Sequence, residues 1–205
     1  MRELDKAIVL NPANNAAHFR IGEAHVFQCE FQKALAKFET IDPNFIQDFR
    51  VTQICLALIG AGRNEEAQRR LDAHRDAYPA DAGGLVASTR AMVHALFGQK
   101  REAEDAIREA APKRGFGHFH HTAYQIACAY ALMNKKVQAV EYLSKAADAG
   151  LHCYPLFECD ANLANLRSDP GFETFLAAEK KHHERFKIKY GSRNSPSVPT
   201  VGERQ

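Results

Sequence analysis

Apolar and polar residues between positions 122 and 149 follow the pattern of two amphipathic helices joined by a tight polar turn. In each half the apolar residues recur at three- or four-residue intervals, which places them on one face of a helix. Two antiparallel helices in this arrangement would touch through Ala123, Ile126, Ala127, Tyr130, Ala139 and Leu143. This stretch therefore predicts a helical hairpin.

The same pattern occurs three more times upstream, with copies beginning near residues 15, 48, 84 and 120. The spacings between these starts are 33, 36 and 36 residues. Gly22 and Ala34 are small in the first copy, which predicts a close crossing of its two helices. In the second copy, Gly60 and Gly62 mark the turn between helices. The third copy departs at Arg90, where the pattern expects a large apolar residue.

These offsets resemble the tetratricopeptide (TPR) repeat, a 34-residue helical hairpin with the signature W-x₂-L-G-x₂-Y…A-x₃-F. The resemblance implies an all-α fold, a right-handed α-α superhelix with a helical C-terminal cap. We expect four TPR-like hairpins over 15–149, at about 15–47, 48–83, 84–119 and 120–149. Repeat proteins stack such units into a continuous core.

Both ends of the chain depart from the repeat. Residues 1–14 read as an orphan second helix that lacks its partner, which leaves Leu4 and Ile8 uncovered and suggests a longer array or self-association. Residues 150–190 predict two short helices and a longer one opening at Asp169-Pro170. This capping segment resembles the end-of-group segment of bacterial TPR arrays, through Asp160, Leu163, Leu166, Arg167, Asp169, Pro170 and Phe172. The tail at 191–205 predicts disorder.

Composition and charge indicate an ordinary globular protein. Apolar residues make up 45% of the chain, charged residues 25%, and the formal net charge is +2. We therefore expect neither a nucleic acid nor a membrane as partner. The N-terminus lacks the apolar run of a secretion signal. The five cysteines are odd in number and far apart, which favours reduced thiols and a cytoplasmic location.

No motif for catalysis is present: the chain has no G-x-S-x-G, P-loop or H-E-x-x-H sequence. His118, His120 and His121 cluster, but their spacing does not suit a tetrahedral zinc site. We interpret them as solvated or as capping a helix, and His182 and His183 as an exposed helix face. We expect no catalytic residue, no metal and no cofactor.

In TPR arrays the first helix of each hairpin lines a concave surface, and the resemblance carries that role to specific positions here. The peptide-binding residues of this groove would be Phe19, Glu23, Phe49, Leu56, Met92 and Tyr124. The surface is mainly apolar, which suits an extended peptide or a helix. It lacks the lysines and asparagines of a carboxylate clamp. The alternative is that these side chains pack against each other or against the C-terminal segment.

The sequence thus predicts a non-catalytic scaffold that binds a protein or peptide partner. A second hypothesis makes this chain the C-terminal TPR region of a larger bacterial signalling enzyme, a serine/threonine kinase or a nucleotide cyclase, with catalysis elsewhere. A third is a structural protein that assembles with itself through Leu4 and Ile8.

Overall fold

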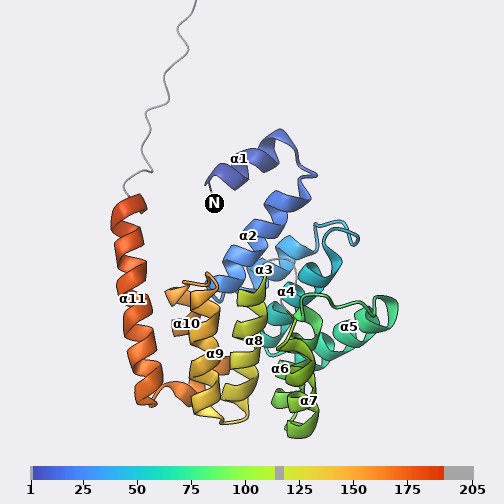
Figure 1. Ribbon diagram of the computed structural model, residues 1–205. Helices are drawn as coiled ribbons and strands as arrows, with labels where there is room; N and C mark the ends of the chain where they lie inside the picture. Colours follow the sequence, from blue (N-terminus) through green and yellow to red (C-terminus); the bar gives the residue numbers. More distant parts are fainter. Residues whose placement is uncertain (1, 114–117, 192–205) are drawn as a thin grey trace, which may run out of the picture.

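The computed structural model describes residues 2–113 and 118–191, and in this part of the chain every regular element is a helix (Figure 1). The predicted disorder at 192–205 lies outside the described residues. The helices are α1 (Arg2–Leu10), α2 (Asn15–Phe27), α3 (Phe31–Phe38), α4 (Gln47–Gly60), α5 (Asn64–Ala77), α6 (Leu85–Leu96), α7 (Lys100–Ala110), α8 (Phe119–Leu132), α9 (Lys136–Asp148), α10 (Tyr154–Cys159), the 3₁₀ helix η2 (Ala161–Leu166) and α11 (Pro170–Gly191).

Four pairs of consecutive helices pack against each other: α2 with α3, α4 with α5, α6 with α7 and α8 with α9. Each range predicted for a hairpin contains one of these pairs. The close crossing expected at Gly22 is present, since a Cβ atom there would lie only 2.5 Å from Cε1 of Phe38. Ala34 on the facing helix is fully buried. The small residues therefore let the α2 and α3 backbones approach.

The first helices of the four pairs, α2, α4, α6 and α8, pack in a row, each against the next. In α8, 10 of 14 residues are buried, among them polar ones such as Thr122 and Gln125. A helix buried on most of its sides belongs to the centre of a core rather than to an open surface. Within that core, Ser88 and Thr89 of α6 both donate to Oε1 of Gln125.

The C-terminal segment turns back toward the beginning of the chain. In Figure 1, α10 lies beside α2, and the two helices are in contact. Next to this contact a disulfide joins Cys29, in the turn after α2, to Cys159 at the end of α10. The expectation that all five cysteines are free thiols is therefore wrong for this pair. Cys55, Cys128 and Cys153 are free.

The capping residue and the apolar residues predicted for the C-terminal segment have the expected roles in its helices. Asp169 accepts hydrogen bonds from the backbone N–H groups of Gly171 and Phe172, at 3.0 and 3.1 Å, and α11 begins at Pro170. Leu163, Leu166 and Phe172 are buried, with α11 against α9 and α10 and η2 against α8. Beyond Glu179 the apolar face of α11 is open to solvent, with Phe186, Ile188 and Tyr190 exposed.

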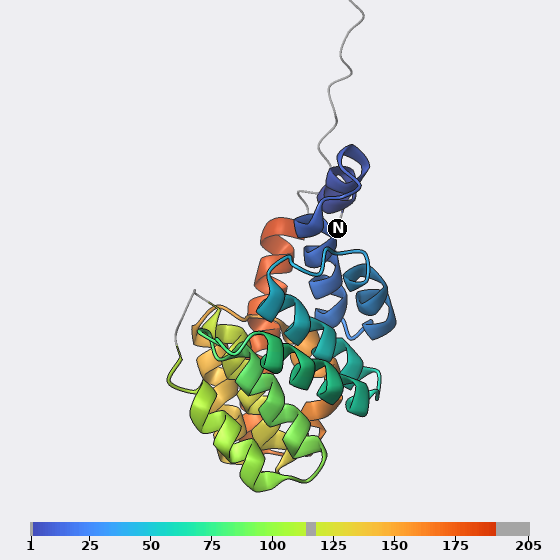
Figure 2. The same cartoon turned by 90° about the vertical axis from the view of Figure 1, so that its right-hand side faces the viewer.

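Helix α1 stands at one end of the molecule, where its main packing partner is α2 (Figure 2). None of its residues is fully buried: Leu4 and Ile8 are half-buried, whereas Val9 and Leu10 are exposed. The apolar side predicted for this segment thus remains only partly covered. Self-association through it stays a prediction.

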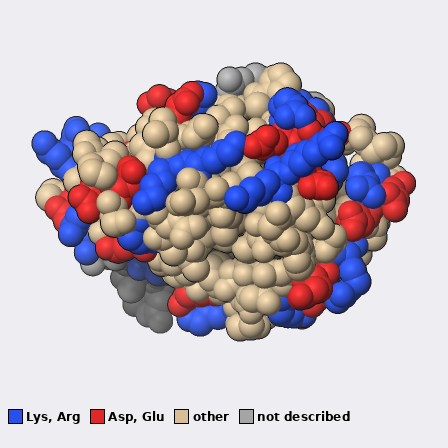
Figure 3. All heavy atoms as spheres, turned by 90° about the horizontal axis from the view of Figure 1, so that it is seen from below, with Lys and Arg blue, Asp and Glu red and all other residues tan. Residues whose placement is uncertain are grey.

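Charges of both signs are interspersed on the surface. Figure 3 shows one face on which Lys and Arg side chains form a band flanked by Asp and Glu, with uncharged surface on either side. An i,i+4 ion pair is present on α9, with Lys145 Nζ donating to Glu141 at 2.6 Å. Among the residues that the structure describes, no helix has the length and apolar character needed to cross a membrane.

Gly84 provides a test of packing within the third hairpin, between the start of α6 and the end of α7. Its φ is +71°, and a Cβ atom would lie 2.8 Å from the carbonyl oxygen of Ala110. We expect Gly84→Ala to lower the free energy of unfolding in urea by about 2–3 kcal/mol, because left-handed strain and a backbone clash add. Gly98 has a φ of +72° but open space around it. Gly98→Ala should lower the free energy of unfolding by only about 1 kcal/mol. Equal losses in the two variants would show that the clash at position 84 costs no stability.

Candidate functional site

All six side chains predicted to line a groove are buried in the structure. The set comprises Phe19, Glu23, Phe49, Leu56, Met92 and Tyr124. Their placement corrects the expectation that they form an exposed concave surface. Whether any of them contributes to binding stays a prediction.

The physical reason is that the two ends of the helix row approach each other. The ring of Phe27 on α2 stacks on His121 of α8 with centroids 6.1 Å apart, and Phe49 of α4 lies 4.7 Å from the same imidazole. The inner faces of α2, α4 and α8 therefore contact one another. This is the alternative in which the apolar side chains pack together and against the C-terminal segment.

Tyr124 packs against the C-terminal segment. Its hydroxyl donates to Asp160, at the start of η2, and its ring lies 5.9 Å from that of Phe157 on α10. Burial, followed by the nearby Asp160 charge, raises the pKa of Tyr124 well above its usual range. Tyr124 thus holds the C-terminal segment on α8 and is not available to a partner.

An open cavity of about 690 Å³ remains at one edge of this core, between the start of α2, the start of α4 and the α5–α6 connection. Phe19, Phe49 and Leu85 form its apolar floor, and they are themselves in the core. At the mouth stand two large apolar side chains, Ile46 and Tyr78, which are 44% and 42% exposed. Phe19 and Phe49 are thus the two predicted site residues that border accessible space.

Ile46 has an unusual backbone conformation. It precedes α4 with φ 37° and ψ 56°, in the left-handed region that β-branched residues avoid. Such strain persists only where the surroundings impose it, and it is concentrated at functional positions. Repeat patterns did not identify Ile46 or Tyr78, because both lie in connections outside the helical register.

The charged groups around the cavity are already paired. Asp48 accepts from Nε2 of His74 at 2.7 Å. Asp81 accepts from the backbone N–H groups of Val86 and Ala87, at 3.2 and 2.9 Å, and so caps α6. Arg20 donates to Glu23 at 2.7 Å. The cavity therefore offers an occupant apolar surface rather than free charge.

A histidine cluster borders the cavity at the start of α8. Ring nitrogens of His118, His120 and His121 lie within 4.8 Å of one another, and His118 also lines the cavity. His121 is only 5% exposed and the other two are half-buried, so the interpretation as solvated side chains is wrong. Nor does His118, at the position before α8, cap the helix through its side chain.

Burial also sets the protonation of this cluster. Desolvation, with smaller effects from His120 and His118, holds the pKa of His121 well below its usual range. The pKa of His120 is lowered for the same reason. Desolvation raises the pKa of Glu23, which faces the cluster from α2. Burial thus favours the neutral form of His120 and His121.

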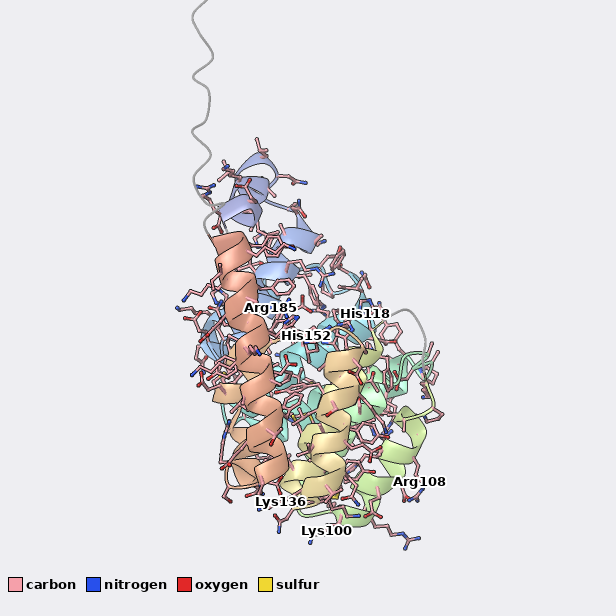
Figure 4. All side chains as sticks on the ribbon, turned by 60° about the vertical axis from the view of Figure 1, so that its left-hand side comes forward. Lys100, Arg108, His118, Lys136, His152 and Arg185 are labelled. Atoms are coloured by element: carbon pink, nitrogen blue, oxygen red, sulfur yellow. A yellow bond between two sulfur atoms is a disulfide. The ribbon has the colours of Figure 1, made fainter. Side chains whose placement is uncertain are left out.

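A second polar cluster joins the α9–α10 connection to α11. Nδ1 of His152 lies 3.2 Å from both carboxylate oxygens of the buried Glu179, and the ring of His152 is 4.0 Å from that of His182. His182 and His183 are half-buried, which corrects their interpretation as an exposed face. Figure 4 shows His118 and His152 far from the end of the molecule that carries Lys100 and Lys136.

Comparison with known proteins does not assign the chain to a family. Protein-family models, curated protein sequences and solved structures were compared with it, and none of them matched. The cavity and the two histidine clusters are therefore interpreted from their own geometry.

Proposed function

We propose that this protein is a non-catalytic protein-binding module of TPR-type hairpins, and that it holds an apolar peptide segment in the cavity between α2, α4 and the α5–α6 connection. The observation that carries the proposal is the pair of exposed apolar side chains, Ile46 and Tyr78, above an apolar floor. The TPR assignment rests on the periodicity and on the four packed helix pairs. The binding site differs from the predicted groove, whose other members lie in the core.

The size and polarity of the cavity favour a short segment of a protein. Its volume of about 690 Å³ falls in the ordinary range for ligand pockets, and its apolar walls suit one or two large side chains. The surrounding carboxylates are engaged by His74 and by the first turn of α6. With its charges paired, the site has little to offer a phosphate or another strongly charged ligand. The mixed surface charge supports the same expectation for nucleic acids.

The test is selection of peptides from a random phage-displayed library on the wild-type protein, followed by affinity measurement on variants. We expect the selected peptides to share large apolar residues, and Ile46→Asp with Tyr78→Asp to weaken their binding about 10-fold or more. Both positions are part-exposed, so the fold should be retained. Aspartate also tolerates the left-handed conformation at position 46 better than isoleucine does.

Val137 supplies the matched control, because it is a 79% exposed apolar side chain on α9 that does not line the cavity. Val137→Asp should leave peptide affinity unchanged. Equal binding by the wild type and the Ile46, Tyr78 variant would exclude the cavity as the binding site. Failure to select any peptide would contradict the proposed function itself. Substitution of Phe49 or Tyr124 would be uninformative here, since both are buried and their loss would disturb folding.

A further inference from the structure

Four potential metal ligands from two helices converge beside the cavity. Three are the histidines at the start of α8, whose ring nitrogens lie within 4.8 Å of one another. The fourth is Glu23 on α2, with Oε1 at 3.7 Å from Nε2 of His121. We propose that His118, His120, His121 and Glu23 bind a divalent transition-metal ion of the zinc class. From the sequence we expected no metal, because the spacing of the three histidines does not suit a tetrahedral zinc site.

The second observation is that several of these ligand atoms are buried without a partner. Glu23 is 6% exposed, and only its Oε2 is paired, with Arg20. Its Oε1 has no hydrogen-bond partner and lies on the side of His121. Nδ1 of His118 and Nδ1 of His120 are also buried and unpaired. Buried polar atoms are nearly always hydrogen-bonded, so a group of three such atoms in one place indicates a missing partner.

A metal ion would supply that partner. Arg20 pairs with Oε2 of Glu23 and leaves Oε1 without a hydrogen-bond partner, so an adjacent dication would supply the partner of that buried oxygen. The rings of Phe27 and Phe49 pack on His121 and form an apolar shell around one side of the cluster. The cluster borders the cavity through His118, which gives an ion a route of entry.

The ligand types decide which ions fit. Three imidazoles and one carboxylate suit zinc, whereas magnesium and calcium prefer oxygen ligands throughout. In a tetrahedral zinc site, ligand atoms about 2.1 Å from the metal lie about 3.4 Å apart. Nε2 of His121 and Oε1 of Glu23, at 3.7 Å, are further apart than this, so binding would draw these two side chains together. Such contraction would join the start of α8 to α2.

The cluster of His152, Glu179 and His182 also places its ligand atoms within 4.8 Å. It differs in two respects that argue against a metal there. Both oxygens of Glu179 are already bonded to His152, and His152 is exposed. This cluster lacks the unpaired buried atoms of the first and provides an internal control.

The experiment uses the full chain without an affinity tag and Zn²⁺ alone as the probe, with Mg²⁺ as a negative probe. Titration calorimetry should give one zinc ion per chain, and zinc but not magnesium should raise the melting temperature. His120→Ala and Glu23→Gln should each weaken zinc binding about 10-fold or more. Both retain most of the packing, since His120 is half-buried and glutamine matches glutamate in size. Circular dichroism without metal checks that each variant is folded.

The control variant combines His152→Ala with His182→Ala and should bind zinc as the wild type does. Loss of binding in this variant, with binding retained in His120→Ala and Glu23→Gln, would move the site to α11 and overturn the proposal. Absence of stoichiometric zinc binding by the wild type would also overturn it. Co²⁺ in place of Zn²⁺ gives a further readout, because its visible absorption reports tetrahedral coordination. None of these measurements depends on peptide binding.

Discussion

Replacing Cys29 and Cys159 together with serine is expected to lower the free energy of unfolding by about 3–5 kcal/mol. The two cysteines are 130 residues apart in the chain, so their disulfide closes a loop that runs from α3 to α10. Chain-entropy arguments assign about 5 kcal/mol to a loop of this length, and native proteins usually realise somewhat less. Because typical domains unfold with 5–15 kcal/mol, this change removes a large share of the total.

Urea unfolding of the oxidised wild type and the double serine variant measures the effect. Cys153→Ser is the matched control, since Cys153 is a half-buried free thiol, and it should change stability little. Equal stability of the wild type and the double variant would contradict the prediction. Thiol titration provides an independent check: the unfolded protein should show three thiols without reductant and five with it. In the native protein, burial raises the pKa of Cys55 and Cys128, so both should react slowly with alkylating reagents.

The helix pairs could be predicted from the sequence because their signals are local. The apolar residues of each helix recur within a few turns, and Gly22 opposite Phe38 marks a crossing within one pair. The same holds for the end of the chain, where Asp169 and Pro170 place the start of α11 through backbone capping alone. Such patterns involve residues close together in the sequence, so they predict local structure without information on the rest of the fold.

The closing of the row could not be predicted, because an open groove and a closed core have the same sequence pattern. Apolar side chains such as Phe49 at inner positions are compatible with either. The difference lies in contacts between α2 and α10 and in the disulfide between Cys29 and Cys159, which join distant parts of the chain. Counting cysteines gave no indication of this pair, since an odd total does not say which of them meet.

The candidate site was missed for the same reason. The histidines at 118–121 were noticed, but the residue that completes the cluster, Glu23, is on the first hairpin and was assigned to a peptide groove. Ile46 and Tyr78 are in connections, where the repeat pattern makes no prediction. Only the folded arrangement shows that these connections flank a cavity.

The second large effect is expected at Asp160, which attaches the C-terminal segment to α8. Its carboxylate is buried and accepts from the hydroxyl of Tyr124 and from the backbone N–H of Asn162 at 2.9 Å. Nearby, Arg167 donates to the carbonyl oxygens of Phe157, Glu158 and Asp160 and so holds the same turn. Asp160→Ala should lower the free energy of unfolding by about 3–4 kcal/mol, since a buried hydroxyl and a helix cap lose their acceptor together.

Two further variants separate the hydrogen bond from the packing. Asp160→Asn keeps the size of the side chain and one acceptor oxygen. It should lower the free energy of unfolding by about half as much as Asp160→Ala does. In a double-mutant cycle with Tyr124→Phe, the combined loss should be smaller than the sum of the single losses, because each single change leaves the other group unpaired. Asp148, an exposed carboxylate at the end of α9, serves as the control, and Asp148→Ala should change stability by about 0.5 kcal/mol at most. Strict additivity of the Asp160 and Tyr124 changes would mean that the two groups do not interact, and the C-terminal segment would then be held by its apolar contacts alone.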